Sequence, residues 1–209
     1  MISIVRRIKG RYRSGKDSIG EGFFAPCLNH CCLYKRAVGY FSSAALRNWA
    51  GAFPRFVGTS DVTIKLIISP QLSNTDLETL QRATTPQSKL ELLQLKSDQL
   101  LELAIELSSP NGSVRAQSEL LAWLVASERL EIRFAFPVHV NDAGIFHLKT
   151  GVFVFPDGDK IAFTGSANET DGGHRRNYES LHCYRSWDER DLHRIDDCDS
   201  EFDEAWNNL

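Results

Sequence analysis

Short apolar runs alternate along the chain with longer amphipathic stretches, which is the pattern of strands connected by helices. Runs of β-branched and aromatic residues predict strands at residues 36–41, 62–68, 130–136, 145–154, 160–164 and 178–184. Apolar positions spaced by three and four predict helices at residues 16–32, 44–50, 73–83, 86–109, 114–127 and 188–207. This order predicts an α/β fold, a mixed β-sheet flanked by helices on both faces.

Turn residues predict how these elements are connected. Residues 155–159 read Phe-Pro-Asp-Gly-Asp and predict the turn of a β-hairpin. Residues 110–112 read Pro-Asn-Gly and divide two leucine-rich helices, which predicts a helical hairpin inserted into the fold. Ser42 and Ser43 follow the first predicted strand, so one of them is expected to cap the next helix.

Length and composition narrow the class of protein. A chain of 209 residues with 42% hydrophobic and 24% charged residues predicts one globular domain over residues 1–209. It ends inside an apolar helix, so we expect it to be the N-terminal part of a larger protein. The longest apolar run, Leu120 to Ala126, is much shorter than the roughly 18–20 residues that cross a bilayer, so we expect no membrane span.

Two features of the sequence indicate a cytoplasmic location. Arg6 and Arg7 follow only a short apolar start, which is the wrong order for a secretory signal. The cysteine count of five is odd, and two of the cysteines, Cys31 and Cys32, are adjacent. A disulfide framework is therefore not expected, and a reducing compartment fits the sequence better.

The formal net charge of −3 hides a strong asymmetry. Residues 1–36 hold eight Lys or Arg against two acidic residues, a balance of +6. Residues 187–209 hold two Arg against nine acidic residues, a balance of −7. Without residues 187–209 the remaining chain has a positive net charge, so a polyanionic partner is compatible with it.

The first candidate for chemistry is the triplet His147-Leu148-Lys149, inside a predicted strand. Alternate residues of a strand share a face, so His147 and Lys149 are expected to point the same way while Leu148 enters the core. A neutral imidazole beside an ammonium suits nucleophilic attack on phosphorus, with the lysine compensating phosphate charge. Taken alone, the triplet also fits an ordinary solvated strand face.

Two further elements follow the triplet. Gly165, Ser166 and Asn168 stand at the end of the next predicted strand, where glycine permits a close backbone approach to an anion and the polar side chains donate hydrogen bonds. Glu179 begins the next alternating segment and is suited to fix the tautomer of an imidazole. Each element alone also fits an ordinary strand end.

Together these elements resemble the phospholipase D superfamily, in its single-motif nuclease branch. The match consists of His147-x-Lys149, Gly165-Ser166-x-Asn168 and Glu179. Residues 36–43, 64–70 and 163–170 extend the resemblance to the phospholipase D-like domains of helicase-associated and restriction proteins. The resemblance implies a metal-independent phosphodiesterase without cofactors that cleaves DNA through a phosphohistidine, in a restriction or defence system.

The resemblance also assigns roles to residues and partners. The catalytic residues it implies are His147, Lys149, Ser166, Asn168 and Glu179. Substrate binding is expected from Ser42, Ser43, Arg175 and Arg176. The mechanism needs a second histidine, and none of the other histidines begins a His-x-Lys triplet, so a homodimer with a shared active site is expected. No nucleotide-binding loop is present, so an ATP-driven helicase would have to be a partner or a fused domain.

Some observations keep other interpretations open. The family aspartate, five residues after the lysine, is replaced by Val154. Cys27, His30, Cys31 and Cys32 suggest zinc at first sight, but a second Cys or His pair at finger-like spacing is missing, so core packing of Cys27 and Cys31 is expected instead. The alternatives to a nuclease are a phosphodiesterase acting on phospholipids, which the basic first third disfavours, and a non-catalytic nucleic-acid-binding or assembly module.

Overall fold

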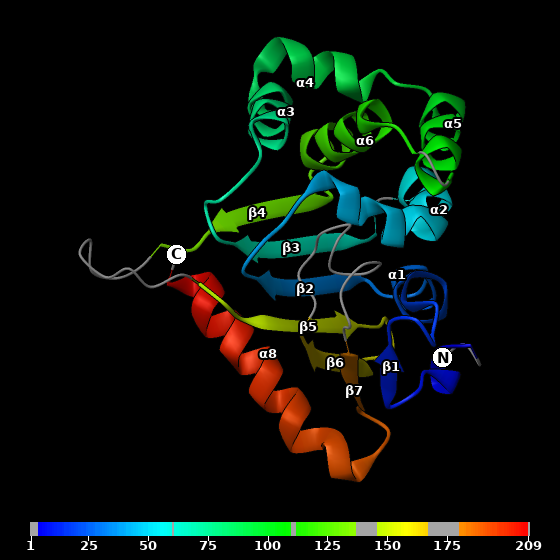
Figure 1. Ribbon diagram of the computed structural model, residues 1–209, viewed down its shortest axis with the longest axis vertical. Helices are drawn as coiled ribbons and strands as arrows, with labels where there is room; N and C mark the ends of the chain where they lie inside the picture. Colours follow the sequence, from blue (N-terminus) through cyan, green and yellow to red (C-terminus); the bar gives the residue numbers. More distant parts are fainter. Residues whose placement is uncertain (1–3, 60, 110–111, 137–145, 167–179, 209) are drawn as a thin grey trace.

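The computed structural model describes residues 4–59, 61–109, 112–136, 146–166 and 180–208. A seven-stranded sheet forms its centre, with the strand order β1-β7-β6-β5-β2-β3-β4 (Figure 1). β2, β3 and β4 run parallel to one another. The remaining neighbours, from β2 through β5, β6 and β7 to β1, pair antiparallel. The sheet is therefore mixed and the fold is α/β, as the sequence predicts.

Strands and helices succeed one another along the chain with the following bounds. The strands are β1 (Arg11–Arg13), β2 (Leu33–Val38), β3 (Thr63–Ile68), β4 (Leu130–Phe134), β5 (Lys149–Val154), β6 (Lys160–Gly165) and β7 (Ser180–Arg185). The α-helices are α1 (Ala25–Leu28), α2 (Phe53–Gly58), α3 (Asn74–Thr84), α4 (Pro86–Leu93), α5 (Ser97–Ser108), α6 (Val114–Ala126) and α8 (Leu192–Asn207). The 3-10 helices are η1 (Val5–Arg7), η3 (Ser43–Ala52) and η4 (Glu189–Asp191), and η2 (Gly20–Phe24) is a π-helix.

The larger core lies between one face of the sheet and the helices η2, α1, η3, α2, α5 and α6. Its centre is aromatic: the rings of Tyr34 in β2 and Phe153 in β5 stack with centroids 4.2 Å apart. Phe23 of η2 meets Phe163 of β6 edge-on at 5.1 Å. Figure 1 shows α3 to α6 grouped as a helical layer beside β4. Burial of these large rings ties the N-terminal helices to the strands that carry the candidate site.

The opposite face of the sheet is covered by α8, which an ion cluster holds in place. Lys35 Nζ in β2 lies 2.6 Å from Asp199 Oδ1 and 2.7 Å from Asp203 Oδ1, both in α8. Lys160 Nζ in β6 lies 2.6 Å from the other oxygen of Asp199. Burial alone would raise the pKa of Asp199, but the hydrogen bonds from Lys160 and Lys35 outweigh it, so the pKa of Asp199 is lowered. The cluster joins two strands to the C-terminal helix.

The segment predicted as one helix over residues 86–109 is divided into α4 and α5. Gln99 caps the start of α5, because its side-chain oxygen accepts a hydrogen bond from the backbone N–H of Lys96 at 2.9 Å. The division separates the predicted leucine stripe, so Leu90 is 58% exposed while Leu100 is buried. The predicted insertion therefore consists of three helices, α4, α5 and α6, rather than a simple hairpin.

Other predicted boundaries differ by a few residues. The helix predicted over residues 16–32 is confined to residues 20–28, in η2 and α1. Ser42 occupies the N-cap position of η3, as expected, but makes no side-chain capping hydrogen bond. The hairpin turn over residues 155–159 is confirmed: the backbone N–H of Phe155 donates to Asp159 O at 2.9 Å, and Gly158 adopts a φ of 86°. The edge strand β1 was not predicted.

Cys27 and Cys31 are core residues, as expected, whereas the adjacent Cys32 is partly exposed. Cys27 and Cys31 are both fully buried, and burial raises the pKa of the Cys31 thiol to about 12. Within the described ranges, no group of three or more His, Cys, Asp or Glu side chains is placed to hold a metal ion. None of the described helices is both long and apolar enough to cross a membrane.

Candidate active site

Three strand ends meet at one edge of the sheet and bring the candidate motifs together. β5 begins at Lys149, which pairs with Val38 at the end of β2. β6 ends at Gly165, and its Thr164 pairs with Thr150 of β5. Because β5 runs antiparallel to both neighbours, its first residues lie beside their last residues. The His-x-Lys triplet and the Gly-Ser element, far apart in sequence, are therefore adjacent in space.

His147 and Lys149 contact each other directly at this edge. Lys149 Nζ lies 2.8 Å from His147 Nε2 and also donates to the backbone oxygen of His147 at 3.3 Å. An ammonium has only donors, so a charged Lys149 makes Nε2 the acceptor in this contact and assigns the ring proton to Nδ1. His147 is exposed and Lys149 partly buried. The arrangement leaves a neutral imidazole beside a positive charge at the surface.

A hydrogen bond and apolar packing hold the segment that carries His147 in place. His147 precedes β5 rather than lying inside a strand, which corrects the prediction. Ser69, directly after β3, donates its hydroxyl to the backbone oxygen of Phe146 at 3.1 Å. Phe146 and Leu148 pack against the apolar cluster that includes Phe202 of α8. Ser69 is therefore a positioning residue that the sequence analysis missed, although Ser-Pro after a buried strand marks its place.

Gly165 allows β6 and β7 to approach closely next to Ser166. A Cβ atom at Gly165 would lie 2.5 Å from the backbone oxygen of Ser180 and 2.7 Å from Leu181 Cδ2. The backbone N–H of Ser166 donates to Ser180 O at 3.3 Å, and Ser166 Oγ accepts from the N–H of Ser180 at 3.4 Å. Ser166 is exposed and fixed by these two contacts to the start of β7.

An open pocket of about 420 Å³ lies at this edge of the sheet. Its lining residues come from three elements and their flanks: His147, Leu148, Lys149, Thr150, Thr164, Gly165, Ser166 and Glu201. Glu201 belongs to α8 and was not anticipated from the sequence, because nothing in the local pattern of α8 indicates that it reaches the site. Hydroxyl, imidazole, ammonium and carboxylate groups thus line a space that is large enough to admit a phosphodiester group and its neighbours.

The serines at the end of β2 lie apart from this pocket. Ser43 is 5% exposed, and its backbone N–H faces Asp76 Oδ1 at 3.3 Å. Ser42 and Ser43 are not among the residues that line the pocket. Substrate binding by these serines stays a prediction.

Several predicted site residues lie outside the described residues: Asn168, Arg175, Arg176 and Glu179. Their roles also stay predictions. Val154, which replaces the family aspartate, lies at the opposite end of β5, where it packs with Ile195 and Cys198 of α8. The replacement thus puts an apolar contact where the family pattern has a carboxylate.

Comparison with known proteins identifies the family and the fold of the chain. Residues 40–206 match the family described as "Cardiolipin synthase, PLD-like domain". The structure is similar to NucT from Helicobacter pylori, with a TM-score of 0.50 and 13% identity over 94% of this chain and 95% of that chain. It is also similar to yeast tyrosyl-DNA phosphodiesterase, with a TM-score of 0.45 and 9% identity over 84% of this chain and 32% of that chain. No match was found among curated proteins. The chain therefore belongs to the phospholipase D-like domain family, which confirms its resemblance to the phospholipase D superfamily.

Proposed function

We propose that this protein is a metal-independent phosphodiesterase that cleaves DNA through a covalent intermediate on His147. The observation that carries the proposal is the 2.8 Å contact between Lys149 Nζ and His147 Nε2 at the wall of a pocket that also holds Ser166. An imidazole nucleophile and a fixed ammonium supply attack and charge compensation without a metal ion.

The proposed reaction has two steps, formation of the phosphohistidine and its hydrolysis. When the substrate binds, one of its phosphate oxygens replaces His147 Nε2 as the acceptor of the hydrogen bond from Lys149 Nζ. The lone pair on Nε2 is then free. This lone pair attacks phosphorus, a P–N bond forms, the P–O bond to the leaving strand breaks, and the leaving oxygen takes a proton from a general acid. Water then gives a proton to the conjugate base of the same acid and attacks phosphorus, the P–N bond breaks, and both the neutral imidazole and the general acid are restored. Asn168 assists Lys149 at the phosphate oxygens, and Glu179 keeps the proton of the ring on Nδ1.

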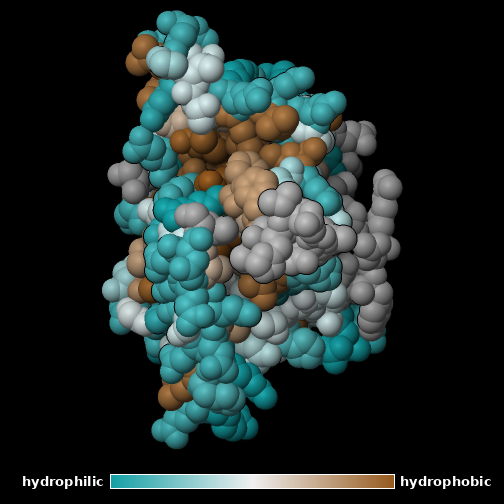
Figure 2. Space-filling model, turned by 90° about the vertical axis from the view of Figure 1, so that its left-hand side faces the viewer, coloured by the Kyte–Doolittle hydropathy of each residue, from teal (hydrophilic) through white to brown (hydrophobic). Residues whose placement is uncertain are grey.

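A two-fold homodimer supplies the general acid in this proposal. Of the described residues that line the pocket, only His147 is a histidine. An isologous interface brings a second copy of His147 to the same phosphate. Figure 2, which views the side toward which β3 and β4 point, shows apolar side chains gathered below the helical layer. Phe136, two residues after the end of β4, is 66% exposed, which supports an apolar contact between subunits at this end.

Mixing tests the shared site. Excess His147→Ala protein added to wild-type protein should lower the activity per wild-type chain, because mixed dimers hold only one imidazole. Sedimentation should give a dimer at micromolar concentration. A fully active monomer, or activity unaffected by the inactive partner, would refute the shared site.

Two groups of basic residues favour DNA as the substrate. One lies in the first third of the chain, and the other consists of Arg175 and Arg176. A role in restriction or defence fits the same resemblance, with any ATP-driven step supplied by a separate chain or domain. The second candidate is a phospholipid substrate, which the family description favours because it names cardiolipin synthase.

The test compares DNA with vesicles of phosphatidylglycerol and cardiolipin, each incubated with wild-type and His147→Ala protein in EDTA. We expect cleavage of DNA by the wild type alone and no release of lipid headgroups. Lipid turnover without DNA cleavage would establish the second candidate. Loss of DNA cleavage in EDTA that magnesium restores would contradict the metal-independent mechanism.

A further inference from the structure

Strands β1 and β7 keep one polar, solvated face beside the candidate site. In β7, Leu181 and Cys183 enter the core while His182 is exposed, and in β1, Tyr12 is buried while Arg11 is exposed. The exposed side chains share the side of the sheet that carries α8, but the apolar side of α8 packs over β5 and β6. An antiparallel sheet edge of this kind leaves one face to water.

This polar face continues into the pocket. Arg13 pairs with Ser180 and Arg11 pairs with His182, and directly paired residues project from the same face. Ser180 is hydrogen-bonded to Ser166, which lines the pocket with His147. The pair Arg13 and Ser180 therefore lies next to the pocket. The pair Arg11 and His182 is the next one along β1 and β7 on the same face.

Arg11 and Arg13 add positive charge to a side of the sheet on which α8 contributes acidic residues, including Glu201 at the pocket. In the described part of the chain, no carboxylate oxygen lies within ion-pair distance of the guanidinium of Arg11 or Arg13. Two nearby cations are already paired: Arg6 with Asp159 at 2.8 Å, and Lys9 with Asp17 at 2.8 Å. The carboxylate of Asp17 also accepts the backbone N–H of Arg13 at 2.9 Å.

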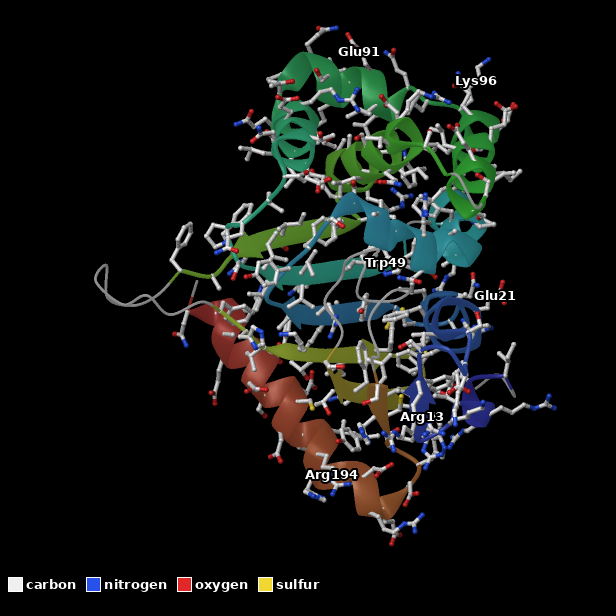
Figure 3. The ribbon with its side chains drawn as sticks, viewed as in Figure 1. Arg13, Glu21, Trp49, Glu91, Lys96 and Arg194 are labelled. Carbon is white, nitrogen blue, oxygen red and sulfur yellow. The ribbon has the colours of Figure 1, made fainter. Side chains whose placement is uncertain are left out.

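The far end of the face carries another cation beside an aromatic ring. Arg194 of α8 lies with its guanidinium carbon 5.2 Å from the ring centroid of Tyr184, whose hydroxyl is 3.3 Å from Thr164 Oγ1. Figure 3 labels Arg13 and Arg194 on the lower part of the molecule, away from Lys96 in the helical layer. Cations alternating with hydroxyl and aromatic groups suit the backbone and bases of a nucleic-acid strand.

The spacing of the cations favours a chain of phosphates over an isolated one. Alternate residues of a strand are separated by roughly twice the rise of about 3.3 Å per residue. Arg11 and Arg13 thus offer two positive groups at a distance close to that between neighbouring phosphates of an extended strand. A headgroup with a single phosphodiester at His147 would leave this row of cations unused.

We propose that the face formed by Arg11, Arg13 and His182 binds the phosphates of the DNA strand that flank the phosphodiester at His147. The inference rests on the proposed cleavage of DNA and adds to it the path by which the strand reaches the pocket. These residues position a polymer and take no part in the chemistry. Their contribution therefore depends on the length of the substrate.

The experiment compares Arg11→Gln and the double variant Arg11→Gln/Arg13→Gln with Lys96→Gln, a matched control in the helical layer. Each is assayed on a labelled single-stranded oligonucleotide and on bis(4-nitrophenyl) phosphate, which has no flanking phosphates. We expect the KM for the oligonucleotide to rise about tenfold in the double variant, and the salt dependence to weaken by about 0.7 in log-log slope for each phosphate that is no longer neutralised. Turnover of the small diester should match the wild type, and Lys96→Gln should match it on both substrates.

Two results would overturn the inference. One is an unchanged KM and salt slope for the oligonucleotide in both arginine variants. The other is an equal loss on both substrates in Arg11→Gln, whose side chain is exposed, because that would place the arginine in the site and not along the strand. If the wild type cleaves neither substrate, the proposed function fails; oligonucleotide binding measured by fluorescence anisotropy with the His147→Ala protein then still decides whether this face holds DNA.

Discussion

Gly165→Ala is the most informative single change at the strand edge that carries the site. The added Cβ would lie 2.5 Å from the backbone oxygen of Ser180. A carbon and a carbonyl oxygen settle at about 3.3–3.6 Å, so β6 and β7 must separate by roughly 1 Å. The obstacle is backbone, which cannot rotate away as a side chain could. The hydrogen bond from Ser166 N to Ser180 O, already 3.3 Å long, would break.

Two consequences follow for the Gly165→Ala protein. Overpacking of this kind costs about 1–3 kcal/mol of unfolding free energy, which for a chain of this size lowers Tm by roughly 3–10 °C. A displacement of roughly 1 Å at Ser166 should also reduce kcat by about ten- to a hundredfold. Calorimetry measures the first effect, and single-turnover cleavage of a labelled oligonucleotide measures the second.

Gly58→Ala is the matched control. A Cβ atom there would meet nothing within 4 Å, and Gly58 does not adopt a left-handed φ. Its stability should change by less than about 1 kcal/mol, with unchanged cleavage. The account of the strand edge is refuted if Gly165→Ala keeps the Tm and the kcat of the wild type.

Three other variants give independent predictions. Ser69→Ala should lower kcat about tenfold with little change in substrate affinity, because the segment before His147 loses its anchor; equal kcat values would contradict this role. Asp199→Asn tests the ion cluster under α8. The pKa of Asp199 is lowered in the folded state, so its carboxylate stabilises the fold at pH values above its unfolded pKa of about 3.9. This stabilisation is lost as the pH falls through the folded pKa. The Asp199→Asn protein should therefore lose less stability than the wild type in acid denaturation. Cys27→Ala should cost about 1 kcal/mol of stability in chemical denaturation and leave activity unchanged, and dependence of its activity on zinc would contradict a purely structural role.

Elements fixed by local chemistry were predictable from the sequence. α3 begins where Ser73 accepts a hydrogen bond from the N–H of Asp76, and the β-branched run of β3 is buried as expected. Elements that depend on distant partners were not. β1 is only three residues long and rich in arginine, so it exists as a strand because β7 offers it an edge.

The candidate site divides in the same way. The pairing of His147 with Lys149 follows from their spacing, and the proximity of Ser166 follows from a hairpin between β5 and β6. The contributions of Ser69 and Glu201 follow from the packing of β3 and α8 around the triplet, which no local pattern encodes.

Nucleophilic attack by His147 can be tested by trapping the covalent intermediate. Wild-type protein is mixed with a short DNA oligonucleotide in EDTA, quenched with denaturant at neutral or basic pH, where a phosphoramidate bond survives, and analysed by mass spectrometry of the peptide that carries His147. The account predicts an oligonucleotide-phosphoryl adduct on His147 that is absent from the His147→Ala protein. Cleavage of the DNA with no adduct at any time before completion, or an adduct on another residue, would contradict it.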